Sequence, residues 1–356
     1  MCGIAGEYLL GPSGVVDPEN IGPMLSVLGH RGPDDWGYYV DERRRAMLLH
    51  RRLSIVDVAG GHQPLSNEDG SIWTVFNGEI YDFERQARHL ERSGHRLATR
   101  SDTEVIVHLY EEYGDDFVQH LRGEFALALY DGKRDELYLV RDRFGIKPLY
   151  YALTRNSVVF ASEMKSLFRH PQLTAEFDPA SVSHLLAGVT IPGTTLFRRV
   201  RQVEPGCLLR CAGGRVAAVR YWDLPFRQDA DPGGPVGPTD EGDAVAEFRR
   251  LFNESVRLRL QGDVEAGVYL SGGIDSAAVA RTMAGMSDRP VKAFTIGFDH
   301  PGYDETADAR AIAAAGGMDH HVLRIRRGAL GMHFAPSLWH SEIPVANGHG
   351  TAKYLL

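Results

Sequence analysis

The chain begins with a residue that can act as a nucleophile without a distant partner. The sequence starts Met1-Cys2-Gly3, and because residue 2 is small, removal of Met1 would leave a thiol and a free α-amine on Cys2. In such a residue the thiol attacks while the adjacent amine serves as general base. An α-amine has an ordinary pKa of about 8, near enough to neutrality to accept and return a proton. Cys2 is therefore a candidate catalytic residue; the alternative is an ordinary second residue that happens to be Cys.

A second segment has the composition of an anion-binding loop. Residues 271–276 read SGGIDS, follow the apolar run 268–270 and precede a helical pattern. Adjacent glycines permit a tight turn, and backbone N–H groups at a helix N-terminus favour an anion. The loop contains no Lys, so we expect it to bind pyrophosphate rather than to act as a Walker loop. Asp275 would repel phosphate unless Mg²⁺ lay between them, so we predict a metal-proximal role for Asp275; the alternative is a Gly-rich connection without function.

The elements that must position Cys2 lie in the first 225 residues. A helical pattern covers 102–113, and Ser101 with Glu104 three residues later predicts a capping box. Residues 131–135 include Gly and predict a hairpin turn between two strands. Strands and helices in this order favour two sheets layered with helices. The predicted strands are 71–76, 125–130, 136–140 and 157–160.

The elements that must position the loop follow a predicted linker. Residues 226–242 are rich in Pro, Gly and Asp and offer almost nothing to bury. After them, strands and helices alternate, which predicts a parallel open sheet. Only three strands are predicted, whereas a doubly wound sheet usually has about five or six, so we expect the chain to end inside its second domain. The expected elements are helices 245–256 and 276–286, strands 268–270, 291–298 and 321–325, and a last helical turn at 352–356.

Composition excludes several classes of protein. The 356 residues carry a formal net charge of −8, which disfavours general nucleic-acid binding by charge attraction. The three Cys residues form no disulfide framework, so we expect a reducing, cytoplasmic location. No signal peptide is visible, and no apolar run approaches the roughly 20 residues that span a bilayer. We therefore expect neither nucleic acid nor a membrane as a partner.

Cys2 and the 271–276 loop, together with five motifs between them, resemble glutamine-hydrolysing asparagine synthetases, a family of class II, N-terminal-nucleophile amidotransferases. The resemblance extends over essentially the whole chain, in order. The family's second synthetase signature, a run of the SGEGSDE type, does not occur in the sequence. The intervening motifs are HRGPD at 30–34, RLSIVD at 52–57, NGEIY at 77–81, SDTE at 101–104 and RDRFGIKPLY at 141–150.

The resemblance implies two domains of different fold class, α+β followed by α/β. Residues 2–225 would form a type-2 glutamine amidotransferase (glutaminase) domain, an αββα sandwich of the Ntn hydrolase kind. Residues 226–242 would be the linker. Residues 243–356 would form part of an ATP-pyrophosphatase domain, a PP-loop parallel sheet that resembles the Rossmann fold.

The resemblance also implies residue roles. Cys2 would attack the glutamine amide, with the Asn77 side chain and the Gly78 N–H as the oxyanion hole, and ATP would bind with Mg²⁺ in the second domain. Preorganised neutral donors of the Asn77 kind suit a developing oxyanion, and a planar guanidinium suits a carboxylate. The implied glutamine-binding residues are Arg52, Ile55, Asn77, Glu79 and Asp102. The implied ATP- and pyrophosphate-binding residues are Leu270, Ser271, Gly272, Gly273, Ile274, Asp275, Ser276 and Ile296, with Asp275 beside Mg²⁺.

The implied activity is that of an ATP-dependent carboxylate–amide ligase. Glutamine would yield glutamate and ammonia, and the ammonia would amidate a carboxylate activated as an acyl-adenylate. Aspartate is the default acceptor, giving asparagine; another small or biosynthetic carboxylic acid is the alternative acceptor. Two further alternatives stay open: a glutaminase subunit that needs a partner chain, and, opposed by the 271–276 loop, a phosphoribosyl or sugar-phosphate amidotransferase. We expect either a homodimer or an assembly with a partner chain that supplies the rest of the synthetase half.

Overall fold

A computed structural model describes residues 1–224, 240–326, 328–343 and 348–356. The chain divides into two compact units, Met1–Phe226 and Arg227–Leu356. The predicted linker, 226–242, lies mostly outside the described residues. Its last three residues differ from the prediction, because the Asp240 side chain accepts a hydrogen bond from the Asp243 N–H and so caps a helix that begins at Glu241.

Two antiparallel six-stranded sheets form the centre of the first unit in the described residues. Short apolar runs separated by tight turns produce them, and residues 131–135 form the predicted hairpin between β6 and β7. One sheet, in spatial order, contains β10 (Val200–Gln202), β8 (Tyr150–Leu153), β9 (Ser157–Ala161), β1 (Gly3–Leu9), β3 (Ala46–Arg52) and β2 (Asp35–Val40). The other contains β12 (Arg215–Arg220), β11 (Cys207–Ala212), β7 (Glu136–Arg141), β6 (Gly123–Asp131), β5 (Ile72–Ile80) and β4 (Leu65–Ser66).

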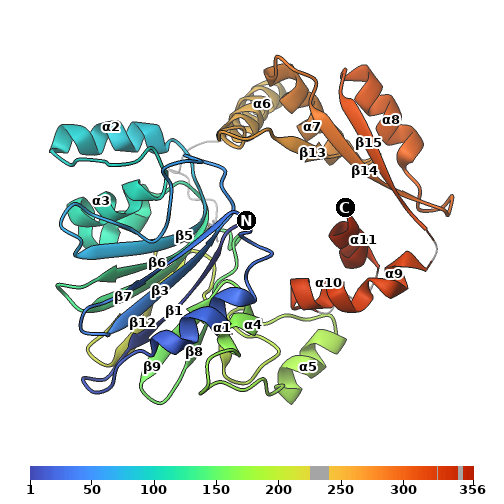
Figure 1. The fold of residues 1–356 in the computed structure, drawn as a ribbon. Helices are drawn as coiled ribbons and strands as arrows, with labels where there is room; N and C mark the ends of the chain where they lie inside the picture. The colour runs from blue at the N-terminus through green and yellow to red at the C-terminus, as the bar shows by residue number, and fades with distance from the viewer. Residues whose placement is uncertain (225–239, 327, 344–347) are drawn as a thin grey trace. The chain divides into compact units, whose positions relative to one another are not determined.

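The two sheets pack face to face, and each has helices on its outer face (Figure 1). Along β6, Leu127 and Leu129 pack with the core beneath α2 and α3, whereas Ala128 and Tyr130 pack between the sheets. This alternation follows from the two-residue period of a strand and requires apolar residues on both faces. The other sheet packs likewise against α1 and α4. The predicted αββα sandwich is confirmed.

Short helices complete the first unit. They are η1 (Pro18–Asn20), α1 (Ile21–Ser26), α2 (Phe83–Ser93), α3 (Glu104–Tyr113), η2 (Gly114–His120), α4 (Met164–Leu167) and α5 (Pro179–Leu186).

The start of α3 differs from the prediction. Ser101 Oγ accepts a hydrogen bond from the Thr103 N–H at 3.2 Å, but Glu104 does not reach back to Ser101. Its carboxylate instead accepts bonds from the N–H groups of Ala98 and Thr99, both at 2.7 Å. The predicted capping box is therefore wrong, because Glu104 is buried and turned toward the loop that precedes it.

The second unit has a parallel sheet of three strands among the described residues, as predicted. Buried Val268, Ala280, Ala293 and Ala309 pack the sheet against its helices. Small and apolar residues on these helices permit close approach to the strands. The elements are α6 (Glu241–Leu258), β13 (Gly267–Tyr269), α7 (Ile274–Met286), β14 (Lys292–Phe298), α8 (Thr306–Ala315), β15 (Asp319–Ile325), α9 (Ala329–Met332), α10 (Phe334–Ser341) and α11 (His349–Leu355). No helix in the described parts of the chain combines the length and the apolar character needed to cross a bilayer.

Candidate functional site

Folding of the first unit brings five separate segments to one small cavity. Cys2 precedes β1, and β1 pairs with β3 so that Gly3 lies opposite Arg51, next to Arg52. The cavity has a volume of about 60 Å³. All the residues predicted for the nucleophile, the oxyanion hole and glutamine binding line it: Cys2, Arg52, Ile55, Asn77, Gly78, Glu79 and Asp102. Met1 lines it too, so removal of Met1 would enlarge it.

The Cys2 thiol is half-enclosed by the loop after β3. Its Sγ lies 3.4 Å from the Leu53 nitrogen, whose N–H donates to it, and 3.6 Å from the Leu53 oxygen. Burial raises the pKa of the Cys2 thiol, although the Leu53 hydrogen bond opposes that effect. The resting group is therefore a neutral thiol, which needs a base to take its proton during attack.

Asn77 is a buried amide without a partner. Its side chain is 1% exposed, and neither Oδ1 nor Nδ2 has a hydrogen-bond partner among the described residues. A buried, unpaired amide costs folding free energy, typically about 1–3 kcal/mol. Such a cost at a cavity wall indicates that the amide is reserved for a ligand.

Gly78 follows Asn77 in β5 and permits close packing on β6. A Cβ at position 78 would lie 2.2 Å from the Glu124 carbonyl oxygen and 2.6 Å from the Phe125 Cα. Both are backbone atoms of a paired strand, so they cannot move aside cheaply. The position therefore requires glycine.

Arg52 supplies a fixed positive charge. Its guanidinium donates to the backbone carbonyls of Val56, Asp57 and Val58 at 3.2, 2.6 and 3.1 Å. Three neutral acceptors orient the planar group without cancelling its charge. A Cβ on Gly61 would lie 2.5 Å from the guanidinium, so glycine there makes room for Arg52.

Asp102 supplies the opposite charge across the cavity. It is 4% exposed, and one carboxylate oxygen accepts from the Ile80 N–H at 3.0 Å. Burial, reinforced by the nearby Glu79 carboxylate, raises the pKa of Asp102 to about 7, although the Ile80 bond opposes the shift. A cation bound at this wall would favour the ionised form.

Two further groups position the site, and no role was predicted for either. Arg31 donates from Nε to the Cys2 carbonyl at 2.8 Å and pairs with Glu163 at 3.0 Å. Burial opposes ionisation of Glu163, but hydrogen bonds from His30 and Lys165 lower its pKa to about 2. Arg31 lies in the HRGPD motif, which was the only sequence signal for it.

Gln63 is the second such group. Its Oε1 accepts from the Phe76 N–H at 2.7 Å, and its Nε2 donates to Thr103 Oγ1 at 3.1 Å. Gln63 thereby ties β5, which carries Asn77, to the segment that carries Asp102. No short motif marks Gln63 in the sequence.

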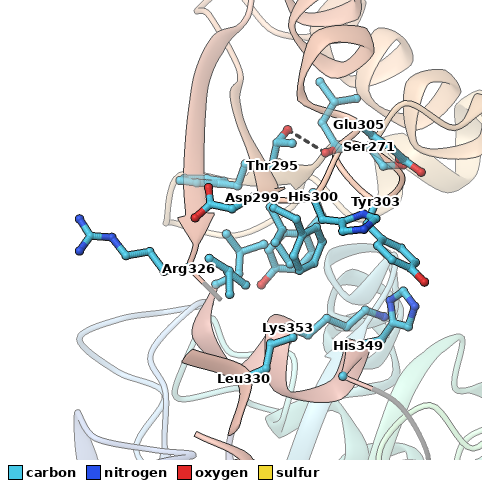
Figure 2. A pocket seen from close by; sticks show the side chains of 18 of the residues that line it. Ser271, Thr295, Asp299, His300, Tyr303, Glu305, Arg326, Leu330, His349 and Lys353 are labelled. Carbon is cyan, nitrogen blue, oxygen red and sulfur yellow. Dashed lines mark hydrogen bonds between the residues drawn. The ribbon is translucent and has the colours of Figure 1, made fainter. Parts of the chain in front are cut away.

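The second unit contains a larger cavity of about 960 Å³ (Figure 2). Ser271, just after the end of β13, and Thr295, in the adjacent parallel strand β14, lie on one side of it, and His349 and Lys353 lie on the other. The carboxyl edge of a parallel sheet is the usual ligand site in open α/β folds. Of the predicted ATP-binding residues, Leu270, Ser271, Ser276 and Ile296 line the cavity.

The 271–276 loop already binds an anion within the chain. The Gly272 N–H donates to a Glu305 carboxylate oxygen at 2.9 Å. The Ser271 N–H donates to Ser276 Oγ, and the two hydroxyls lie 2.8 Å apart. Donors grouped at the start of α7, one of them on a carboxylate, fit a phosphate-containing ligand.

The rest of the loop lies beside the cavity rather than along it. Gly272, Gly273, Ile274 and Asp275 are not among the residues that line it. Asp275 is exposed in the first turn of α7. Its carboxylate can reach solvent and a bound cation, but the carboxylates at the cavity wall are Asp299 and Glu305.

Two family models match the chain. A glutamine amidotransferase domain model matches residues 1–222, and an asparagine synthase model matches residues 247–356. Among solved structures, the glutamine phosphoribosylpyrophosphate amidotransferase of B. subtilis shares 18% identity over 90% of this chain and 65% of that chain, with a TM-score of 0.46, a likeness too weak to support an argument.

Curated relatives match almost the whole chain. It is 36% identical to glutamine-hydrolyzing asparagine synthetase 1 of Bacillus subtilis, over 100% of this chain and 55% of the relative. It is 35% identical to amidase chry2 of Gibberella zeae, over 95% of this chain and 52% of the relative. It is also 35% identical to amidase chyE of Penicillium rubens, over 93% of this chain and 50% of the relative. The chain spans about half the length of the curated relatives it matches.

Proposed function

The chain belongs to the glutamine-hydrolysing asparagine synthetase family of glutamine amidotransferases, as its motifs indicated, and from this premise we propose that it hydrolyses glutamine at Cys2 and delivers ammonia for amidation of a carboxylate. The observation that carries the proposal is the first cavity. A thiol, an unpaired buried amide and charged side chains of both signs line one small space. Glutamine offers the matching groups: an amide carbonyl, an α-carboxylate and an α-ammonium.

The charged groups orient the substrate. Arg52 pairs with the α-carboxylate of glutamine through its planar guanidinium. Asp102 and Glu79 pair with the α-ammonium. With both ends of the zwitterion bound by these charged groups, the side-chain amide extends toward Cys2.

The reaction proceeds through a thioester. After removal of Met1, the α-amine of Cys2 takes the thiol proton as sulfur bonds to the amide carbon. Asn77 Nδ2 and the Gly78 N–H stabilise the oxyanion, and one such donor contributes roughly 2.7–4 kcal/mol. The C–N bond then breaks, the proton passes to the departing nitrogen, and ammonia leaves. Water attacks the thioester and releases glutamate and the free thiol.

The second unit activates the acceptor. ATP would bind in the larger cavity, with its adenine beside Leu270 and Ile296 and its pyrophosphate at Ser271–Ser276. Asp275 would hold Mg²⁺, which would offset the phosphate charge. ATP supplies the adenylyl group that turns a carboxylate into an acyl-adenylate. Ammonia displaces AMP and gives the amide.

Covalent labelling tests the first half of the proposal. A diazoketone analogue of glutamine carries an electrophilic carbon where the amide lies, so it alkylates a thiol at the base of the site. We expect one adduct, found by intact mass and mapped by peptide sequencing to Cys2, and protection by glutamine. Labelling of Cys207 or Cys211 instead, or labelling that glutamine does not prevent, would contradict the proposal; both of these thiols are buried.

The acceptor is aspartate in the first candidate and another carboxylic acid in the second. Relatives named as amidases, as well as one named as an asparagine synthetase, favour testing both. Pyrophosphate release from ATP, measured with a panel of carboxylic acids, separates the candidates. Stimulation by aspartate alone supports asparagine synthesis. Stimulation of pyrophosphate release by another acid alone would exclude aspartate as the acceptor.

A further inference from the structure

We propose that Glu68, His95, His108 and Glu111 form a binding site for a divalent transition-metal ion of the zinc class, separate from both cavities. The residues come from three places in the first unit: the segment after β4, the segment after α2, and α3. Among the described residues, this is the group whose ligand atoms gather within 4.8 Å of one another.

The separations between ligand atoms suit tetrahedral coordination. Zinc binds His nitrogen and carboxylate oxygen at about 2.0–2.2 Å, which places neighbouring ligand atoms of a tetrahedron about 3.4 Å apart. His108 Nδ1 lies 3.0 Å from a Glu111 oxygen and 3.6 Å from a Glu68 oxygen. His95 Nδ1 lies 3.5 and 3.9 Å from the same two carboxylates. Both rings therefore direct the same nitrogen toward a shared pair of carboxylates.

The outer nitrogens of the rings face carboxylates of their own. His95 Nε2 lies 2.9 Å from a Glu112 oxygen, and His108 Nε2 lies 3.7 Å from a Glu104 oxygen. The Glu112 carboxylate behind His95 fixes the proton on the outer nitrogen of that ring and leaves its inner nitrogen free to bind metal. The Glu104 oxygen lies beyond hydrogen-bond distance of His108 Nε2 and contributes only its charge there. Glu111 is also oriented, because Asn67 Nδ2 donates to its other oxygen at 2.8 Å.

The burial of the four residues suits a metal that enters from solvent. The His108 side chain is 0% exposed, and its Nε2 has no hydrogen-bond partner in the described residues. The Glu68 side chain is 40% exposed, which leaves one side open to an ion. Imidazole and carboxylate ligands together favour zinc or a neighbouring first-row ion over Ca²⁺ or Mg²⁺, which prefer oxygen ligands.

A bound ion would stabilise the segment that carries Asp102. His95 lies at the start of the connection between α2 and α3, and Asp102 lies at its end. Glu104, behind His108, also accepts from the Ala98 and Thr99 N–H groups of that connection. The ion would thus join the start of the connection to α3 and serve as a structural metal.

Metal binding by the full chain tests the proposal. The background is the Cys2→Ala variant, because a free aminothiol binds zinc by itself. After chelator treatment and desalting, Zn²⁺ is titrated against a chromophoric chelator, and Co²⁺ is added separately to record its visible d–d bands. We expect one equivalent of Zn²⁺, a rise in Tm when it binds, and the intense bands of tetrahedral Co²⁺.

Variants locate the ligands. Glu112→Gln should lower Zn²⁺ affinity about 10–100-fold through its effect on His95, and His95→Ala and Glu111→Gln should each lower it further and remove the rise in Tm. The matched control is His89→Ala, because His89 is an exposed histidine of α2 whose ring contacts the Tyr113 hydroxyl; its affinity should equal that of the parent. Circular dichroism verifies that each variant is folded. Absence of stoichiometric binding in the parent, or binding that folded His95→Ala and Glu111→Gln retain, would show that the cluster is an ion-pair network and overturn the proposal.

Discussion

At the scale of single residues, the first cavity combines groups that are unfavourable for folding. Asn77 is buried without a partner, and burial raises the pKa of Asp102. Each would be better satisfied by a ligand than by the protein alone. Local penalties gathered at one cavity are typical of a functional site.

The raised pKa of Asp102 predicts that glutamine binding weakens in acid. The carboxyl is ionised above its pKa of about 7 and neutral below it, and only the ionised form pairs with an α-ammonium. In the Cys2→Ala variant, which cannot form the thioester, the Kd for glutamine should rise about tenfold from about pH 8 to about pH 6. Isothermal titration calorimetry across this pH range measures the Kd for glutamine.

Two double variants control that experiment. Cys2→Ala with Asp102→Asn should bind glutamine weakly and with no pH dependence over the range. Cys2→Ala with Asp116→Asn, which changes an exposed aspartate of η2, should retain the full dependence. A pH dependence that survives Asp102→Asn would assign the effect to another group.

Replacement of Asn77 should lower the activity of the protein without lowering its stability. Because its amide has no partner in the described part of the fold, Asn77→Ala removes no hydrogen bond of the free protein and relieves the cost of a buried unpaired amide, so Tm should equal or exceed that of the parent. Its loss from the oxyanion hole should lower kcat for glutamine hydrolysis about 10²–10³-fold. Steady-state glutamate release measures kcat, and thermal unfolding measures Tm. An unchanged kcat would exclude Asn77 from the oxyanion hole.

At the scale of elements, β5 is both a core strand and a wall of the site. It pairs with β6 over its whole length and carries Asn77, Gly78 and Glu79 at its end. Its register therefore decides where these three residues lie relative to Cys2. A change that separates β5 from β6 should affect stability and catalysis together.

Gly78→Ala makes that change. The added Cβ would meet backbone atoms of β6 at 2.2 and 2.6 Å, and overpacking of this kind typically costs about 1–3 kcal/mol. Thermal unfolding should show a lower Tm, and glutamate release should fall. Gly11→Ala is the control, since a Cβ there has no atom within 4 Å. Equal Tm values for the two variants would contradict the packing argument.

Element types were predictable from the sequence, but details at their ends were not. Alternating or continuous apolar runs identified β5, β6, β7 and β9, because such patterns report burial directly. The capping box failed because Ser101 and Glu104 have the right spacing, yet Glu104 bonds to Ala98 and Thr99. Spacing cannot show which of several nearby N–H groups a buried carboxylate will choose.

The candidate metal cluster shows the same limit at longer range. Glu68, His95 and His108 lie in three segments, and no ligand spacing in the sequence links them. By contrast, Cys2, Asn77 and Asp102 could be predicted, because each lies in a motif shared with a family. Gln63, which has a positioning role but no motif, could not.

At the scale of the whole molecule, described residues of each of the two units line a cavity suited to a proposed ligand. The two cavities differ as their proposed ligands do: a space of about 60 Å³ lined by opposite charges, and one of about 960 Å³ beside a loop that binds an anion. The order of motifs in the sequence predicted that both kinds of site would occur in one chain. In the proposed reaction, ammonia released in the first unit would be the nucleophile that the second unit requires.

The proposal that Cys2 hydrolyses glutamine is tested by glutamate release from the purified chain, with N-terminal processing verified by intact mass. We expect release by chain that begins at Cys2. We expect none from Cys2→Ala, and none from chain that bears an extra residue before Cys2, because that residue removes the free α-amine from Cys2. Hydrolysis at the parent rate by Cys2→Ala would contradict the proposal.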